Sequence, residues 1–241
     1  MKINCDMGEG FGAWQMGADD QLMPHIDMAN IACGLHASDP VTMADCVALA
    51  VSHKVSIGAH PGYPDLLGFG RRDFPIEGKE LESTVLYQLG ALEGICRAHG
   101  AQLDYIKPHG ALYNKMMRDA ATFETLLNAV RCFNANLPLV IQAGSVEANA
   151  RRREQADKLG VQLWFEAFAD RSYENDGSLT PRTVEGAVHN SVEKIILQAR
   201  QILNEGTVLS RQGDCLTLAA DTLCLHGDNP LCVEAAPLIR S

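Results

Sequence analysis

Short apolar runs alternate with longer amphipathic segments along the whole chain. The apolar runs predict strands near residues 2–7, 28–36, 55–60, 103–109, 137–143, 161–169 and 221–227. Strands that alternate with helices are typical of repeated β/α units and a mainly parallel sheet. Because no shift of composition marks a domain boundary, the pattern predicts one α/β domain, a seven-stranded β/α barrel over residues 1–241.

Helices are marked by their periodicity and by signals at their ends. Apolar residues from Leu81 to Cys96 recur every three or four positions, which predicts one buried helix face, and Gly100 is placed to end that helix. Asp39 followed by Pro40 predicts a helix start, with Asp39 as the N-cap and Pro40 as the first helical residue.

Two further signals lie near the C-terminus. Residues 207–218 alternate around Gln212 and Gly213, which predicts a β-hairpin outside the barrel. Asn229 and Pro230 repeat the helix-start signal just before the last apolar segment.

Four of the eight histidines close predicted strands, namely His36, His60, His109 and His226. The carboxyl ends of the strands are the edge of a β/α barrel where active sites are assembled. Side chains alternate between the two faces of a strand, and each histidine stands on the face opposite the apolar residues that meet the helices. These histidines are therefore expected to point into the barrel.

The same alternation directs other ionisable side chains into the barrel interior at the carboxyl ends of the strands. We call this region the funnel. The expected set is Asp6, His36, His60, Lys107, His109, Glu166, Asp170 and His226. Imidazole and carboxylate are the usual ligands of Zn²⁺ and related ions, and a bound metal can polarise a carbonyl. The alternative is that some of these groups are interior residues satisfied by hydrogen bonds, with no chemistry of their own.

The loops that follow the carboxyl ends of the strands carry further candidate site residues. The connection from residue 61 to 74 is long and rich in glycine and proline, as lids and binding loops are. Its Arg71 and Arg72 either bind a carboxylate or phosphate or pair with Asp65 and Asp73.

Two other loops flank the funnel. In "NCDMGEGFG" the glycines would let the backbone approach a ligand while Asp6 and Glu9 point toward it; the alternative is a tight turn with solvated acids. "FADRSYENDG" places Arg171 and Tyr173 beside Asp170, where a plain salt bridge is the alternative to a role in the site.

Composition narrows the range of partners. Acidic residues outnumber basic ones by 30 to 20, which argues against nucleic acid and against an anionic membrane surface as partners. The N-terminus lacks the apolar segment of a signal peptide, and the eight cysteines form no C-x-x-C pair. We therefore expect a cytoplasmic protein with buried free thiols and no membrane association.

Seven motifs in fixed order carry a family resemblance. "NCDMGEGFG", "NIACGLHASDP", "GAHPGYPDLLGFGRRDF", "YQLGAL", "KPHGALYN", "EAFADRSY" and "CLHGDNP" resemble the LamB/YcsF family over essentially the whole chain. Leu35 and Ser38 stand where Phe and Gly are expected, and Met28 replaces a small residue.

The resemblance implies a distorted seven-stranded β/α barrel similar to the glycoside hydrolase/deacetylase superfamily. It also implies the A component of an ATP-dependent 5-oxoprolinase, which acts with two partner subunits, B and C. The reaction would convert 5-oxo-L-proline, ATP and two waters to L-glutamate, ADP and phosphate. Because the chain has no G-x-x-x-x-G-K-[ST] loop, we expect ATP to be handled mainly by the partners.

Residue roles follow from combining the resemblance with the funnel. Analogy with the deacetylases implies a divalent metal held by Asp6, His60 and His109. The expected catalytic groups, as base or oxyanion stabiliser, are Glu9, Lys107, Glu166 and Asp170. The expected substrate-binding residues are His36, Arg71, Arg72, Arg171, His226 and Asp228.

Two other functions remain open at this point. One is a stand-alone metal-dependent carbohydrate deacetylase or amidase that needs no ATP. The other is a non-enzymatic subunit whose barrel holds a small ligand. Association of the chain with copies of itself, as a homo-oligomer, is also left open.

Overall fold

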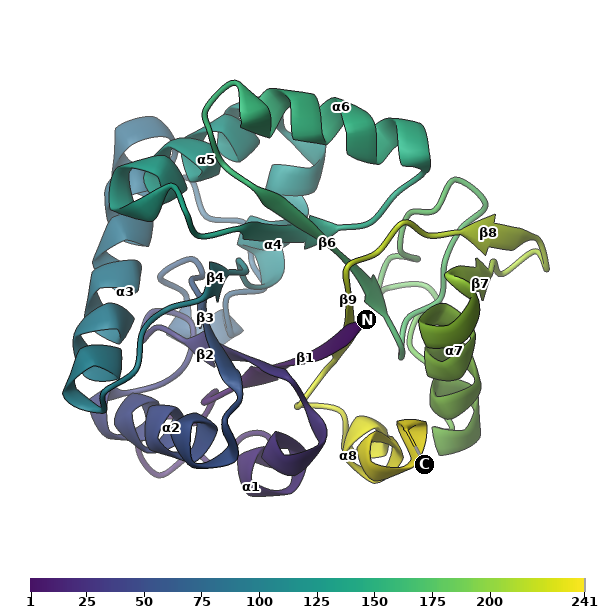
Figure 1. The fold of residues 1–241 in the computed structure, drawn as a ribbon, viewed down its shortest axis with the longest axis horizontal. Helices are drawn as coiled ribbons and strands as arrows, with labels where there is room; N and C mark the ends of the chain where they lie inside the picture. The colour runs from purple at the N-terminus through teal and green to yellow at the C-terminus, as the bar shows by residue number, and fades with distance from the viewer. Residues whose placement is uncertain (241) are drawn as a thin grey trace.

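The computed structural model describes residues 1–240, and within them seven parallel strands close into a barrel with helices packed around its outside (Figure 1). In barrel order the strands are β1 (Lys2–Met7), β2 (Met28–Ala32), β3 (Ser56–His60), β4 (Tyr105–Ile106), β5 (Leu139–Gln142), β6 (Leu163–Phe168) and β9 (Thr222–Leu225). Each strand falls within a predicted strand, which confirms the β/α barrel. The barrel is distorted at β4, which pairs with β5 at Ile106 and Leu139 alone.

The helices lie between the strands in sequence. They are α1 (Asp19–Leu22), α2 (Pro40–His53), α3 (Gly78–Ala98), α4 (Gly110–Arg118), α5 (Ala120–Asn134), α6 (Val146–Asp157), α7 (Val192–Glu205) and α8 (Pro230–Ile239), with 3-10 turns η1 (Met23–His25) and η2 (Leu66–Gly68). No helix within residues 1–240 is both long and apolar enough to cross a membrane.

The predicted helix starts are confirmed by their caps. The Asp39 side chain accepts hydrogen bonds from the backbone N–H groups of Val41 and Thr42, directly before Pro40 opens α2. Asn229 accepts from the N–H of Leu231 at the start of α8. Such caps satisfy amide groups that have no partner inside the helix, and each is worth about 1 kcal/mol.

The apolar stripe of α3 faces the barrel as predicted. Residues Leu81, Val85, Leu89, Leu92 and Cys96 are all buried in the main core. Fully burying a leucine side chain contributes about 1.5–3 kcal/mol, so this stripe attaches the helix firmly. Gly100, with φ of +71°, follows the end of the helix.

The predicted hairpin is also present. β7 (Thr207–Leu209) and β8 (Cys215–Thr217) form an antiparallel pair separate from the barrel. In Figure 1 the pair lies beside α7, outside the ring of strands. A bridge between Tyr173 and Ser210 connects the hairpin to the loop that follows β6.

The N-terminal half of the barrel interior is filled by apolar side chains. Met28, Tyr105 and Val140 form a small buried cluster with Trp164 packed against it. Gly58 on β3 makes room for the ring of Tyr105, because a Cβ at that position would lie 2.1 Å from a ring carbon. Buried side chains therefore pack this part of the barrel interior.

Several predicted strands end earlier than expected. β2 ends at Ala32, four residues before His36, because the chain turns at Gly34, where φ is +90°. β6 and β9 likewise end before Asp170 and His226. β4 also ends before His109. The direction of these four side chains is therefore set by the loops that follow the strands and not by strand alternation alone.

Candidate active site

The structure brings the eight expected funnel residues together at the carboxyl end of the barrel. All are buried except His226, which is partly exposed. Together with Glu9 they form three connected groups: a lysine with two carboxylates, a histidine cluster with one carboxylate, and a histidine–aspartate pair.

Lys107 lies at the base of the funnel. Its Nζ is 2.9 Å from Oδ1 of Asp6, 3.2 Å from Oε2 of Glu166 and 3.1 Å from Oδ1 of Asn4. Burial alone would lower the pKa of Lys107, but the Asp6 carboxylate, the Cys224 thiol and Glu166 outweigh burial and raise it well above its ordinary value. The ammonium is therefore charged and has opposite charges on two sides.

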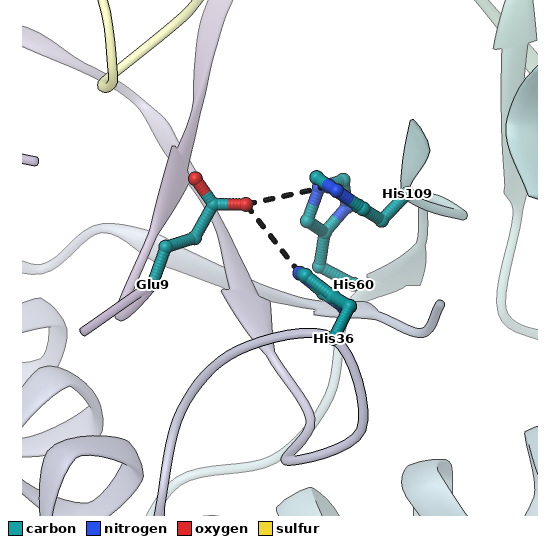
Figure 2. Close-up of side chains that lie close together, drawn as sticks. All are labelled: Glu9, His36, His60 and His109. Atoms are coloured by element: carbon teal, nitrogen blue, oxygen red, sulfur yellow. Dashed lines mark hydrogen bonds and ion pairs between the residues drawn. The ribbon is translucent and has the colours of Figure 1, made fainter. Parts of the chain in front are cut away.

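In the second group, three imidazoles converge with Glu9 (Figure 2). His36 stacks on His109 with ring centroids 3.8 Å apart, and His60 meets His109 edge-on. Glu9 Oε1 lies 3.4 Å from His36 Nε2 and 3.3 Å from His109 Nδ1. The four side chains come from the loops after β1, β2 and β4 and from the last residue of β3.

Glycines in the loop after β3 make the close approach of these rings feasible. A Cβ on Gly62 would lie 2.6 Å from His36 Nδ1. A Cβ on Gly70, where φ is +62°, would lie 2.7 Å from the Cβ of His36 and 2.9 Å from Cδ2 of His109. The loop can therefore cover the imidazoles only because these positions carry no side chain.

Hydrogen bonds to backbone carbonyls orient two of the rings. His60 Nδ1 lies 2.6 Å from the carbonyl oxygen of Lys107, and His109 Nε2 lies 2.8 Å from that of Phe69. A carbonyl only accepts, so we assign the hydrogen of each ring to that nitrogen. The remaining nitrogens, His60 Nε2 and His109 Nδ1, then present lone pairs to each other across 3.0 Å.

This cluster fits a divalent cation. Glu9 Oε1 and both nitrogens of His36 are buried without a hydrogen-bond partner in residues 1–240. Burial and the Asp6 carboxylate raise the pKa of Glu9, while burial and the neighbouring imidazoles lower the pKa values of His36 and His109. One ligand atom from each of the four residues lies within 4.8 Å of the others. Imidazole nitrogens held by carbonyls, with one carboxylate, are a donor set typical of Zn²⁺ and related ions.

The cluster changes the expected metal set. The deacetylase analogy implies Asp6 as a ligand, but its Oδ1, although 3.5 Å from His60 Nε2, is bound by Lys107 and by the amide of Asn30. The four-residue cluster contains Glu9 and His36 beside His60 and His109, whereas Asp6 groups with Cys224 and His226.

A histidine–aspartate pair forms the opposite wall of the funnel. His226 Nδ1 lies 2.8 and 3.0 Å from the two carboxylate oxygens of Asp170, and the ring stacks on Phe168. Burial would raise the pKa of Asp170, but His226 and Arg182 lower it to about 2. The charged carboxylate fixes the hydrogen of His226 on Nδ1 and leaves Nε2 available to exchange a proton. Asp170, one of the groups expected as base or oxyanion stabiliser, thus lies where it orients the ring of His226.

The expected arginines differ in what they contact. Arg71 pairs with Asp228 and lies over the ring of Phe69 at 5.0 Å. Arg72 pairs with Asp65, the alternative that the sequence left open. Asp73, the other acid considered, pairs instead with Arg118.

Arg171 is buried and donates to two backbone carbonyls, those of Ala187 and Thr180. It therefore supports the loop after β6 and makes no salt bridge with Asp170 within residues 1–240. Sequence reasoning missed Arg182 in this same loop, whose guanidinium lies 3.5 Å from His226 Nε2. A single arginine in a long irregular loop carries no pattern that would have identified it.

Comparison with known proteins agrees with this architecture. The LamB/YcsF family profile matches residues 1–241. Proteins that carry the name of the 5-oxoprolinase A subunit, from Vibrio cholerae and Chromohalobacter salexigens, are 52% and 51% identical; the alignments cover 100% and 99% of this chain and 96% and 94% of those proteins. The crystal structure of a lactam utilization protein from Thermus thermophilus has a TM-score of 0.91 and 40% identity, covering 100% of this chain and 94% of that one. By sequence and by fold, the chain belongs to the LamB/YcsF family.

Proposed function

We propose that this chain is the A component of a 5-oxoprolinase, which opens the lactam of 5-oxo-L-proline to L-glutamate with coupled ATP hydrolysis. Relatives of that name match it at about half of all positions over nearly their full length. The observation that carries the proposal is the funnel, where Lys107, the imidazole cluster and the Asp170–His226 pair face one another.

Opening a lactam requires several groups to act on one amide. Water must be deprotonated, the developing oxyanion must be stabilised, and the ring nitrogen must receive a proton as it leaves. His226 Nε2, oriented by Asp170, is placed to move these protons. The ammonium of Lys107 provides positive charge for an oxyanion in a site that excludes water.

A divalent cation fits the nitrogens of His36, His60 and His109 and the carboxylate of Glu9. When bound, it would supply Lewis-acid polarisation of a carbonyl oxygen and acidification of a water. The protein's own contribution there is orientation, since the carbonyls of Lys107 and Phe69 fix His60 and His109.

We assign ATP as co-substrate and place its handling mainly in partner subunits B and C. The chain lacks a phosphate-binding G-x-x-x-x-G-K-[ST] loop, and its funnel is lined by carboxylates that would repel a triphosphate. All eight cysteines are free thiols, which fits a reducing cytoplasm.

The test is to combine the purified chain with partners B and C, 5-oxo-L-proline and ATP, and to follow glutamate and ADP together. We expect both products in equal amounts and none without this chain. A well-folded complex that forms no glutamate would refute the proposal. Tight ATP binding by the isolated chain would refute the assignment of ATP handling to partner subunits B and C. ATP-independent, chelator-sensitive turnover of N-acetylated sugars would instead establish a deacetylase.

A further inference from the structure

Three of the four arginines around the funnel are already engaged. Arg71 pairs with Asp228, and Arg72 pairs with Asp65. Arg171 is buried and holds two backbone carbonyls. Each of these three guanidinium groups therefore already has an oxygen partner within residues 1–240.

Arg182 is different. It is exposed, and its guanidinium meets a ring nitrogen, at 3.5 Å from His226 Nε2. Among residues 1–240 no carboxylate lies within ion-pair distance of its guanidinium, so its positive charge has no direct counter-ion at the mouth.

The loop that carries Arg182 is held at both ends. Arg171 Nε donates to the carbonyl of Ala187 at 3.2 Å, and its NH2 group donates to that of Thr180 at 2.6 Å. Ser172 adds backbone bonds to the same two residues: its N–H donates to the carbonyl of Ala187, and its carbonyl accepts from the N–H of Thr180. Arg182 is thus presented by a braced segment of chain.

The funnel carries more acidic than basic side chains. The acids on its walls are Asp6, Glu9, Glu166, Asp170 and Asp228. Lys107 and Arg71 are both paired with members of that set. An anionic substrate entering between these carboxylates is repelled unless one cation at the mouth is unpaired.

We propose that Arg182 binds the carboxylate of the lactam substrate and so orients the ring amide toward the funnel. This assignment rests on the proposed function. The planar guanidinium can hold a carboxylate through two parallel hydrogen bonds, which fixes direction as well as position. Its contact with His226 places the bound ring next to the group that we assign to proton transfer.

The experiment compares two lactams that differ only in the carboxylate, 5-oxo-L-proline and 2-pyrrolidinone. Binding to the full chain is measured by calorimetry, and kcat/KM is measured for the complex with its partners. Arg182→Gln should lower the affinity and kcat/KM for 5-oxo-L-proline by about 10- to 100-fold, as expected for the loss of charge-assisted hydrogen bonds. The same two quantities for 2-pyrrolidinone should be unchanged. Arg182→Lys should recover part of the loss because it keeps the charge.

The matched control is Arg131→Gln. Arg131 is exposed in the last turn of α5, and this helix end lies at the opposite end of the barrel, so neither lactam should be affected. The proposal is overturned if wild type does not prefer 5-oxo-L-proline, if Arg182→Gln keeps that preference, or if Arg131→Gln loses it equally.

These outcomes separate the two proposals. Glutamate formation with an unchanged preference in Arg182→Gln would remove Arg182 as the anchor and leave the 5-oxoprolinase function standing. A carboxylate preference that depends on Arg182, in a complex that makes no glutamate, would keep the anion site and remove the function.

Discussion

His60 Nε2 and His109 Nδ1 face each other across 3.0 Å while the other nitrogen of each ring is held by a backbone carbonyl. Two lone pairs in contact repel, so a positive charge must lie between or beside them. Burial and the neighbouring His60 ring lower the pKa of His109, which disfavours an added proton on that ring. A metal cation shared with Glu9 and His36 resolves the contact.

We therefore expect the chain to retain about one divalent ion after dialysis, as a preformed ligand set should. His60→Ala or His109→Ala should lower the affinity for Zn²⁺ by more than the roughly 10- to 100-fold typical of losing an outer partner. Elemental analysis and metal titration measure both effects. His53→Ala, an exposed histidine at the end of α2, is the control and should change nothing.

The same titration distinguishes the two ligand sets. If the cluster binds the ion, Glu9→Gln should weaken metal binding more than Asp6→Asn, because Asp6 is bound by Lys107 and Asn30. The reverse order would restore Asp6, His60 and His109 as the ligand set.

Asp170→Asn should affect both catalysis and acid stability. Replacing the carboxylate removes the group that orients the ring of His226 through Nδ1, so kcat for glutamate formation should fall on the order of 10²- to 10⁴-fold. Burial would raise the pKa of Asp170, but the pairing with His226 lowers it to about 2, below its ordinary 3.8. A carboxyl group whose pKa is lower in the folded than in the unfolded protein stabilises the fold at pH values above its unfolded pKa. This contribution is lost as the pH falls from about 4 to about 2.

Unfolding in urea at several pH values measures the direction of this change in stability with pH. The shift corresponds to about 2 kcal/mol, so Asp170→Asn should be less stable than wild type by about that amount at pH 7, and the difference should shrink toward pH 2. A constant difference across that range, together with unchanged kcat, would show that the pair plays neither role.

Lys107→Met should destabilise the barrel strongly. The substitution leaves Asp6 and Glu166 buried without their shared cation, and breaking a buried pair typically costs about 3–5 kcal/mol. Urea unfolding at pH 7 measures the loss. Lys107→Met combined with Glu166→Gln should lose less, since one uncompensated charge is removed.

The matched control for this substitution is Lys158→Met. Lys158 forms an exposed pair with Glu154 on the surface, so its loss should stay within about 0.5 kcal/mol. Equal losses for both lysine variants would mean that burial of Lys107 has no special energetic consequence.

The barrel could be predicted because the information that specifies it is local and periodic. Strands, the α2 and α8 caps and the β7–β8 hairpin each follow from residues close together in the chain, and each is confirmed. Alternation along β1 and β6 also explains why Asp6 and Glu166 face the interior.

The assignment of roles within the funnel could not be predicted in the same way. Glu9, His36 and Arg182 lie on loops, where no period relates position to direction. Whether Asp170 acts as a base or orients His226 depends on a contact 56 residues away in sequence. Such pairings are set by how the loops pack over the barrel, which a single sequence does not encode in a readable pattern.

Two glycines provide a direct test of that packing. Gly70 and Gly78 both adopt left-handed backbone, with φ of +62° and +52°, so alanine should cost a similar strain of about 1 kcal/mol at either position. Only at Gly70 would the new methyl group meet the imidazoles of the cluster, because nothing lies within 4 Å of a Cβ at Gly78. Gly70→Ala should therefore weaken both metal binding and glutamate formation, whereas Gly78→Ala should lose stability alone. Titration, turnover and urea unfolding of the two variants separate these effects. If both variants lost the same amount of stability and neither changed metal affinity, the close fit of the β3 loop over His36 and His109 would have no bearing on the site.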